Sequence, residues 1–209
     1  FMGLNYNYLL YFPQDRLWEV LQALAMRCEV EGMQPTKVKF PDHDLILPLT
    51  TSWGRPQEVS WDQGQYDFLL SMIFEEDPAI LDYLAYRGDD LDVRSPPEEG
   101  KPVQHAIGYI DLTVYADLSE HWALGQPNEM CLFKFGTTGT HMSFLFADST
   151  SIRKSFIHLL KGHSGISGIF DWENDYGELF WFRGKHADFR LSSNYLLPGE
   201  IEQELKRGW

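Results

Sequence analysis

The sequence predicts an α+β fold with a predominantly antiparallel sheet and two long helices. Short segments rich in aromatic and aliphatic residues recur along the 209-residue chain, and Gly, Pro, Asn and Asp separate them. Two longer segments carry apolar residues at helical spacing instead. Hydrophobic residues form 44% of the chain, which is enough for a core without disulfides or metal ions. We therefore expect a single globular domain over residues 1–209, with 1–102 and 103–209 as its candidate halves.

The first half of the chain opens with a predicted strand at 6–12, which ends at Pro13. A helix follows over 14–28, where leucines recur at helical spacing. Asp77 and Pro78 then predict the start of a short helix, because Asp is a favoured N-cap and Pro a favoured first helical residue. Gly88 predicts the end of that helix. The other elements expected in this half are strands at 37–40, 45–49 and 66–74, and a loop over 52–64.

The second half of the chain is expected to hold one further strand, two hairpins and two helices. Asp148, Ser149 and Thr150 predict the N-terminus of a long helix that Gly162 ends. A final short helix is predicted to begin at Pro198. The predicted strands are 106–116, the hairpin of 130–135 with 141–146, and the hairpin of 166–172 with 178–183.

The same order of elements occurs twice in this prediction. A strand, a helix and a hairpin follow one another from residue 6 to 49, and again from residue 141 to 183. This order suggests two βαββ halves that share one sheet. It resembles the tandem βαββ folds of GyrI-like small-molecule binding domains, in topology and not in any motif. The resemblance implies a groove between the halves that holds a small ligand.

The charge of the chain restricts its partners. The formal net charge is −14, so we expect no nucleic acid partner and no anionic membrane, because both repel an acidic surface. A basic protein partner is favoured by the same field. The excess of negative charge is concentrated in residues 75–100, which contain nine acidic and two basic residues. This segment is either a solvated acidic loop or an acidic contact surface.

Motifs for metal or phosphate binding are incomplete in this sequence. Segment 171–177 has alternating acids, but Tyr176 and Phe182 stand where a calcium loop needs glycine and glutamate. The Gly/Thr segment 136–140 lacks the lysine of a phosphate-binding loop. The seven histidines include no pair at helical ligand spacing. We therefore assign no catalytic residue, no metal ligand and no cofactor.

The two cysteines, Cys28 and Cys131, predict a reducing compartment and a core role. Cys28 falls on the apolar face of the predicted first helix, and Cys131 falls in a predicted strand. The sequence shows neither a signal peptide nor an apolar run long enough to span a membrane. The cytoplasm is the expected location by elimination.

The tryptophans are the feature that a core role explains least. Trp53 and Trp61 fall in the predicted loop 52–64, and loop tryptophans are typical of protein contacts and ligand pockets. We therefore take these two residues, with acids of the 75–92 region, as the candidate partner- or ligand-binding set. The acids of this set are Glu75, Glu76, Asp77, Asp89, Asp90 and Asp92.

Three functions are compatible with these patterns. The first is a non-catalytic binding protein whose acidic, aromatic-rich surface engages a basic protein, for example as an immunity-type inhibitor of a nuclease toxin. The second is a small-molecule sensor or carrier with a cationic or aromatic ligand between its two halves. The third is an enzyme of unrecognised class, with His141, His158 and His163 as its candidate groups. The sequence leaves the oligomeric state open.

Overall fold

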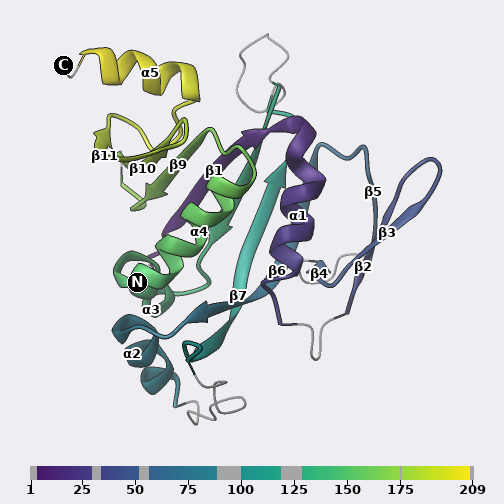
Figure 1. Ribbon diagram of the computed structural model, residues 1–209, viewed down its shortest axis with the longest axis horizontal. Helices are drawn as coiled ribbons and strands as arrows, with labels where there is room; N and C mark the ends of the chain where they lie inside the picture. Colours follow the sequence, from purple (N-terminus) through teal and green to yellow (C-terminus); the bar gives the residue numbers. More distant parts are fainter. Residues whose placement is uncertain are drawn as a thin grey trace.

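An eight-stranded antiparallel sheet runs through the centre of the computed structural model, which describes residues 4–29, 34–51, 57–88, 100–118, 129–174 and 176–207 (Figure 1). The strand order is β11-β10-β9-β1-β8-β7-β6-β4, and the neighbours pair antiparallel. The α+β class with a large antiparallel sheet is thus confirmed. The strands are β1 Asn7–Pro13, β4 Thr50–Thr51, β6 Gln65–Glu75, β7 Gln104–Tyr115, β8 Met130–Gly136, β9 Ser167–Asp171, β10 Gly177–Phe182 and β11 Lys185–Leu191.

A second sheet of three strands stands beside the first, at the right of Figure 1. Its strands are β2 Thr36–Lys39, β3 Asp44–Leu47 and β5 Glu58–Ser60. β2 pairs antiparallel with β3, as predicted for a hairpin, and parallel with β5. The segment predicted as a loop over 52–64 therefore contributes a short strand, and its residues 52–56 lie outside the described chain.

The helices cover both faces of the large sheet. α1 and α4 lie across one face in Figure 1, and their apolar side chains share a core with β1, β6, β7 and β8. α5 packs on the opposite face, over β1, β9 and β10. The helices are the 3-10 turn η1 Gln14–Arg16, α1 Leu17–Ala25, α2 Pro78–Arg87, α3 Thr140–Asp148, α4 Thr150–Gly162 and α5 Pro198–Arg207.

Strand β1 is central because both of its faces are buried. Tyr8, Leu10 and Phe12 point into the core under α1 and α4, whereas Leu9 and Tyr11 point into the core under α5. Successive side chains of a strand point to opposite faces, so a strand between two cores is apolar at every position. This explains the continuous apolar run of residues 8–12.

The predicted strand at 141–146 is wrong, because these residues form helix α3. Its buried residues Met142, Leu145 and Phe146 follow the helical spacing of three and four. A strand would instead place Phe144 on the same face as Met142 and Phe146. Phe144 is 47% exposed, which agrees with the helix.

The arrangement of two βαββ halves in one sheet is not what the structure shows. The second set of elements lacks the strand at 141–146, and the 37–49 hairpin lies in the smaller sheet. The predicted helix 14–28 is also shorter than expected, since it comprises η1 and α1. Cys28 lies beyond α1 and forms a bridge with Met72 of β6.

Other predicted elements are confirmed. Asp77 caps α2, and Gly88 ends it in the left-handed conformation with φ of 68°. The β9–β10 hairpin and the helix that ends at Gly162 lie where expected. The polar edge strand β11 was not predicted. In the described part of the chain, no helix is both long and apolar enough to span a membrane.

Candidate functional site

The carboxylate of Asp77 joins the N-termini of two helices. One oxygen, Oδ1, accepts the backbone N–H of Ile80 at 3.0 Å and so caps α2. The other oxygen, Oδ2, accepts the Ser149 hydroxyl at 2.8 Å and the backbone N–H of Ser151 at 2.9 Å. Ser149 connects α3 to α4, and its Oγ accepts the N–H of Ile152. Asp77 therefore fixes α2 against the corner between α3 and α4.

This environment also determines the ionisation of Asp77. Burial alone would raise the pKa of its carboxyl, but donors from Ser151, Ile80 and Ser149 hold the pKa below its ordinary value. A carboxylate that accepts several hydrogen bonds is stabilised in its charged form. Asp77 is thus a negatively charged structural link at neutral pH.

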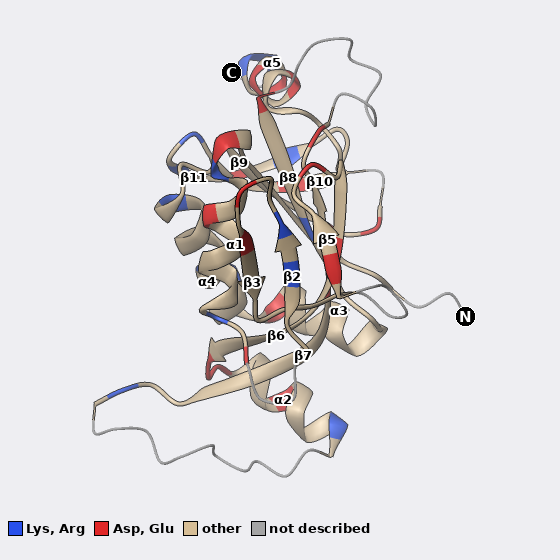
Figure 2. Ribbon diagram, turned by 90° about the vertical axis from the view of Figure 1, so that its right-hand side faces the viewer, with Lys and Arg blue, Asp and Glu red and all other residues tan. Residues whose placement is uncertain are grey.

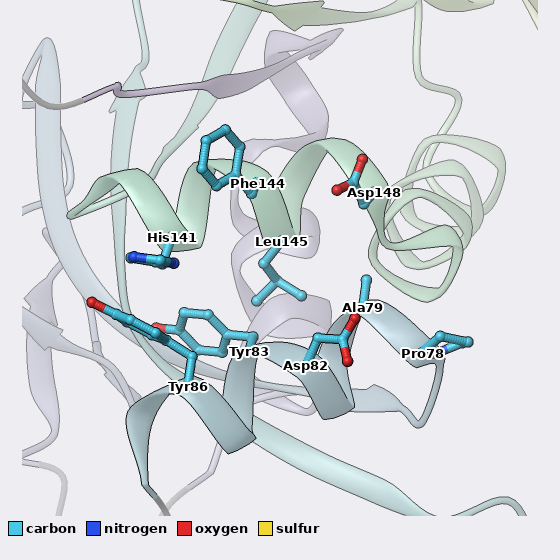
Figure 3. Close-up of a pocket in the computed structure, with 9 residues that line it drawn as sticks. All are labelled: Pro78, Ala79, Asp82, Tyr83, Tyr86, His141, Phe144, Leu145 and Asp148. Atoms are coloured by element: carbon cyan, nitrogen blue, oxygen red, sulfur yellow. The ribbon is translucent and has the colours of Figure 1, made fainter.

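A groove of about 320 Å³ lies between α2 and α3, on the helices that Asp77 holds together (Figure 3). Figure 3 shows Tyr83 and Tyr86 of α2 facing His141 and Leu145 of α3. The rings of Tyr86 and His141 stack, with centroids 3.4 Å apart and planes at 19°. The full lining is Pro78, Ala79, Asp82, Tyr83, Tyr86, His141, Phe144, Leu145 and Asp148.

The groove combines accessible aromatic rings with unpaired acids. Tyr86 is 62% exposed, and the neighbouring Phe144 is about half exposed, at 47%. Within the described part of the chain, neither Asp82 nor Asp148 takes a hydrogen bond or an ion pair. Aromatic faces and carboxylates both attract cations. The groove is therefore suited to a guanidinium or an ammonium group.

A guanidinium of the protein itself already lies at the edge of this surface. The Arg87 guanidinium carbon is 5.9 Å from the centroid of the Tyr83 ring, one helical turn away. This separation is within the range of a cation–π contact. The aromatic wall of α2 is thus accessible to a planar cation.

The acids predicted at the end of β6 have different environments. Glu75 is exposed, and Glu76 Oε2 lies 2.9 Å from Nε2 of His105. Asp77 has the structural role given above. Three predicted acids (Asp89, Asp90 and Asp92) and Trp53 lie outside the described residues. The described acids of this set directly precede α2 in the chain, and none of them lines the groove.

Trp61 lies in another part of the molecule. It is 43% exposed and stacks with Phe40, which in turn stacks with His43. Trp61 precedes β6 and Glu75 ends it, so the two residues are about 30 Å apart along an extended strand. The structure therefore does not bring Trp61 to the acids at the end of β6.

The charges near Trp61 are also largely paired. Lys37 and Lys39 of β2 form ion pairs with Asp44 of β3 and Glu58 of β5, at 2.7 and 2.5 Å. Figure 2 shows blue segments on β2, which lies between β3 and β5, and red on β5. Asp44 and Glu58 near Trp61 thus have cationic partners, whereas Asp82 and Asp148 of the groove have none among the described residues.

None of the residues that line the groove belongs to the binding set predicted from the sequence, and His141 was a candidate only for the enzyme hypothesis. The assignment of 141–146 to a strand concealed that His141 and Phe144 share the exposed side of a helix. Helical spacing of the apolar residues Met142, Leu145 and Phe146 was the available signal.

The residues of the enzyme hypothesis do not gather in this groove. His141 lines it, whereas His158 lies on α4 and His163 follows the end of that helix. Among the described residues, no group of three or more His, Cys, Asp or Glu could hold a metal ion. Burial raises the pKa of both cysteine thiols to about 12, in keeping with their predicted core role.

Comparison with known protein families, with curated proteins and with solved structures finds no match to this chain.

Proposed function

We propose that this protein is a non-catalytic binding protein that receives a basic side chain of a protein partner in the groove between α2 and α3. The observation that carries this proposal is the combination of exposed aromatic rings with two unpaired carboxylates in one groove. Arginine is the favoured occupant, because its planar guanidinium stacks on aromatic rings and pairs with carboxylates.

The charge of the whole chain supports a basic partner. The net charge is −14, and the 75–100 segment that contains α2 carries much of the excess. Such a field accelerates encounter with a basic protein and orients it toward the groove. An immunity-type inhibitor, in which acids oppose the basic active site of a nuclease, is one concrete form of this proposal.

The proposal is tested with two short peptides that differ in charge alone. One has arginine between glycines, and the other has citrulline, which keeps the shape and removes the charge. Isothermal titration calorimetry at low salt should detect the arginine peptide and not the citrulline peptide. Tyr86→Leu and Asp82→Asn should each weaken the arginine peptide about twofold to fivefold.

A matched control separates the groove from general attraction by an acidic protein. Asp188 is an exposed acid on β11, outside the groove, and takes no ion pair in the described structure. Asp188→Asn should leave the affinity unchanged. Equal loss in Asp188→Asn and Asp82→Asn, or equal binding of the two peptides, would contradict the proposal.

A further inference from the structure

A second pocket lies on the face of the large sheet that α1 and α4 do not cover. Phe68, Leu112 and Phe133 point into the core under these helices. Alternate positions on β6, β7 and β8 point to the other face, and they include the polar residues Asp67, Asp111, Thr113 and Lys134. On that face, α5 packs over β1, β9 and β10.

The strand register places these polar residues side by side. Thr113 of β7 is opposite both Asp67 of β6 and Lys134 of β8. In the next row, Asp111 is opposite Gly136 of β8. Asp111 is thus a diagonal neighbour of Asp67 and of Lys134, about 7 Å from each at Cβ. The residues line a pocket of about 300 Å³, at the lower end of the range for ligand sites.

Gly136 keeps the floor of this pocket open. It lies between Asp111 and Asn7 in the sheet, since Asn7 of β1 is its partner on the other side. A Cβ atom at Gly136 would lie 3.1 Å from Oδ1 of Asn7 and 3.7 Å from Cβ of Asp111. A glycine within a strand often marks a place where another molecule approaches the backbone.

Asn7 directs an acceptor toward this floor. Its side chain is held because Nδ2 donates to Oδ2 of Asp171 and to the carbonyl of Asn5, each at 3.0 Å. Asp171 is in turn held by Nδ2 of Asn194 at 2.7 Å. Asn7 is only 8% exposed, and its Oδ1, beside Gly136, receives no hydrogen bond from the described residues. An amide oxygen that opens into a pocket can accept a hydrogen bond from the N–H donor of a ligand.

The charges around the pocket are incompletely paired. Asp67 accepts the hydroxyl of Thr113 at 2.9 Å. In contrast, the described residues provide no hydrogen-bond donor to Asp111 and no carboxylate within ion-pair distance of Lys134. Burial and then the charge of Asp67 raise the pKa of Asp111. A cation near Asp111 and an anion near Lys134 would each be stabilised.

We propose that this pocket binds a small zwitterion that carries a primary amine and a carboxylate, such as an amino acid. The ammonium group would lie among Asp111, Asp67 and Oδ1 of Asn7, and the carboxylate would pair with Lys134. This site is distinct from the groove between α2 and α3, so either proposal can fail without the other.

The proposal is tested by calorimetric titration of the wild-type protein with glycine and 4-aminobutyrate. Methylamine and acetate, which carry one charge each, serve as the comparison probes. We expect saturable binding of at least one zwitterion below about 10 mM, and at least about tenfold weaker binding of both single-charge probes. Methylamine binding as strong as that of the zwitterions would overturn the proposal, as would the absence of saturation with both zwitterions.

Variants localise the binding to the pocket. Asp111→Asn and Lys134→Met should each weaken the zwitterion about tenfold, whereas Asp188→Asn should change its affinity less than about twofold. Gly136→Ala should also weaken binding, because the added methyl group narrows the floor without changing a charge. Thermal unfolding of each variant verifies its fold. Undiminished binding in folded Asp111→Asn or Lys134→Met would overturn the proposal.

Discussion

At the scale of single residues, two aspartates have opposite effects on folding. Asp77 lies among donors that stabilise its charged form, and its folded-state pKa is lowered. Asp111 lies beside another carboxylate, with no hydrogen-bond donor among the described residues, and its folded-state pKa is raised. Ionisation of Asp77 therefore stabilises the fold, whereas ionisation of Asp111 destabilises it.

Asp77→Ala should destabilise the protein by about 2 kcal/mol at pH 7, because it removes acceptors from the N-termini of α2 and α4. The stabilisation by Asp77 is complete above the unfolded pKa, and it is lost as the pH falls through the lower folded pKa. Urea unfolding should show a smaller difference in unfolding free energy between Asp77→Ala and wild type at acid pH than at pH 7. A difference that stays constant across this pH range would contradict the role of the carboxylate.

Asp111→Asn should raise the free energy of unfolding at pH 7. A raised folded-state pKa means that wild-type stability is lost as the pH rises through that pKa, and the amide avoids this loss. Below the unfolded pKa the two proteins should be equally stable. Urea unfolding over pH 3 to 7 measures this difference. A variant less stable than wild type at pH 7 would contradict the prediction, because it would show that the Asp111 carboxylate is stabilised by a partner in the folded protein.

At the scale of secondary structure, α3 determines both the packing and the groove. Its inner residues Met142, Leu145 and Phe146 enter the main core, while His141 and Phe144 remain on the exposed side. The short segment of alternating apolar residues fits a strand as well as a helix when the sequence is read alone. Tertiary packing against β1 and α4 selects the helix, since Phe146 contacts Tyr8 and Phe156.

Phe146→Ala should destabilise the protein by about 3–5 kcal/mol, because it leaves a cavity in the core. Phe144→Ala, on the exposed side of the same helix, should change stability by about 0.5 kcal/mol or less. Chemical denaturation of the two variants provides the comparison. Similar large losses of stability in both variants would favour the strand predicted from the sequence, since a strand places the two rings on one face.

Most long elements were predictable because their patterns are local. The cap formed by Asp77 and Pro78 and the apolar run of β1 are visible in the sequence, and both lie where expected. β11 was not predictable in the same way, because this edge strand is polar and is defined by its pairing with β10. Because α3 forms one side of the groove, the error at 141–146 concealed the lining residues His141, Phe144 and Leu145.

At the scale of the whole molecule, acidic and aromatic residues do not form one continuous surface. Trp61 and its stacked neighbours lie on the small sheet, where the lysines of β2 neutralise nearby acids. The unpaired acids Asp82 and Asp148 lie at the other end of β6, on the helices that form the groove. We therefore expect a basic partner to contact the α2–α3 groove and not the surface around Trp61.

The most direct test of this claim is to locate a bound arginine by NMR. In the complex with the arginine peptide, nuclear Overhauser effects should connect the arginine side chain to the rings of Tyr83, Tyr86 and His141. The citrulline peptide should give none of these contacts, and the Trp61 indole should be unaffected by either peptide. Arginine contacts to Trp61, or equal contacts from citrulline, would contradict the assignment of the α2–α3 groove as a binding site for a basic side chain.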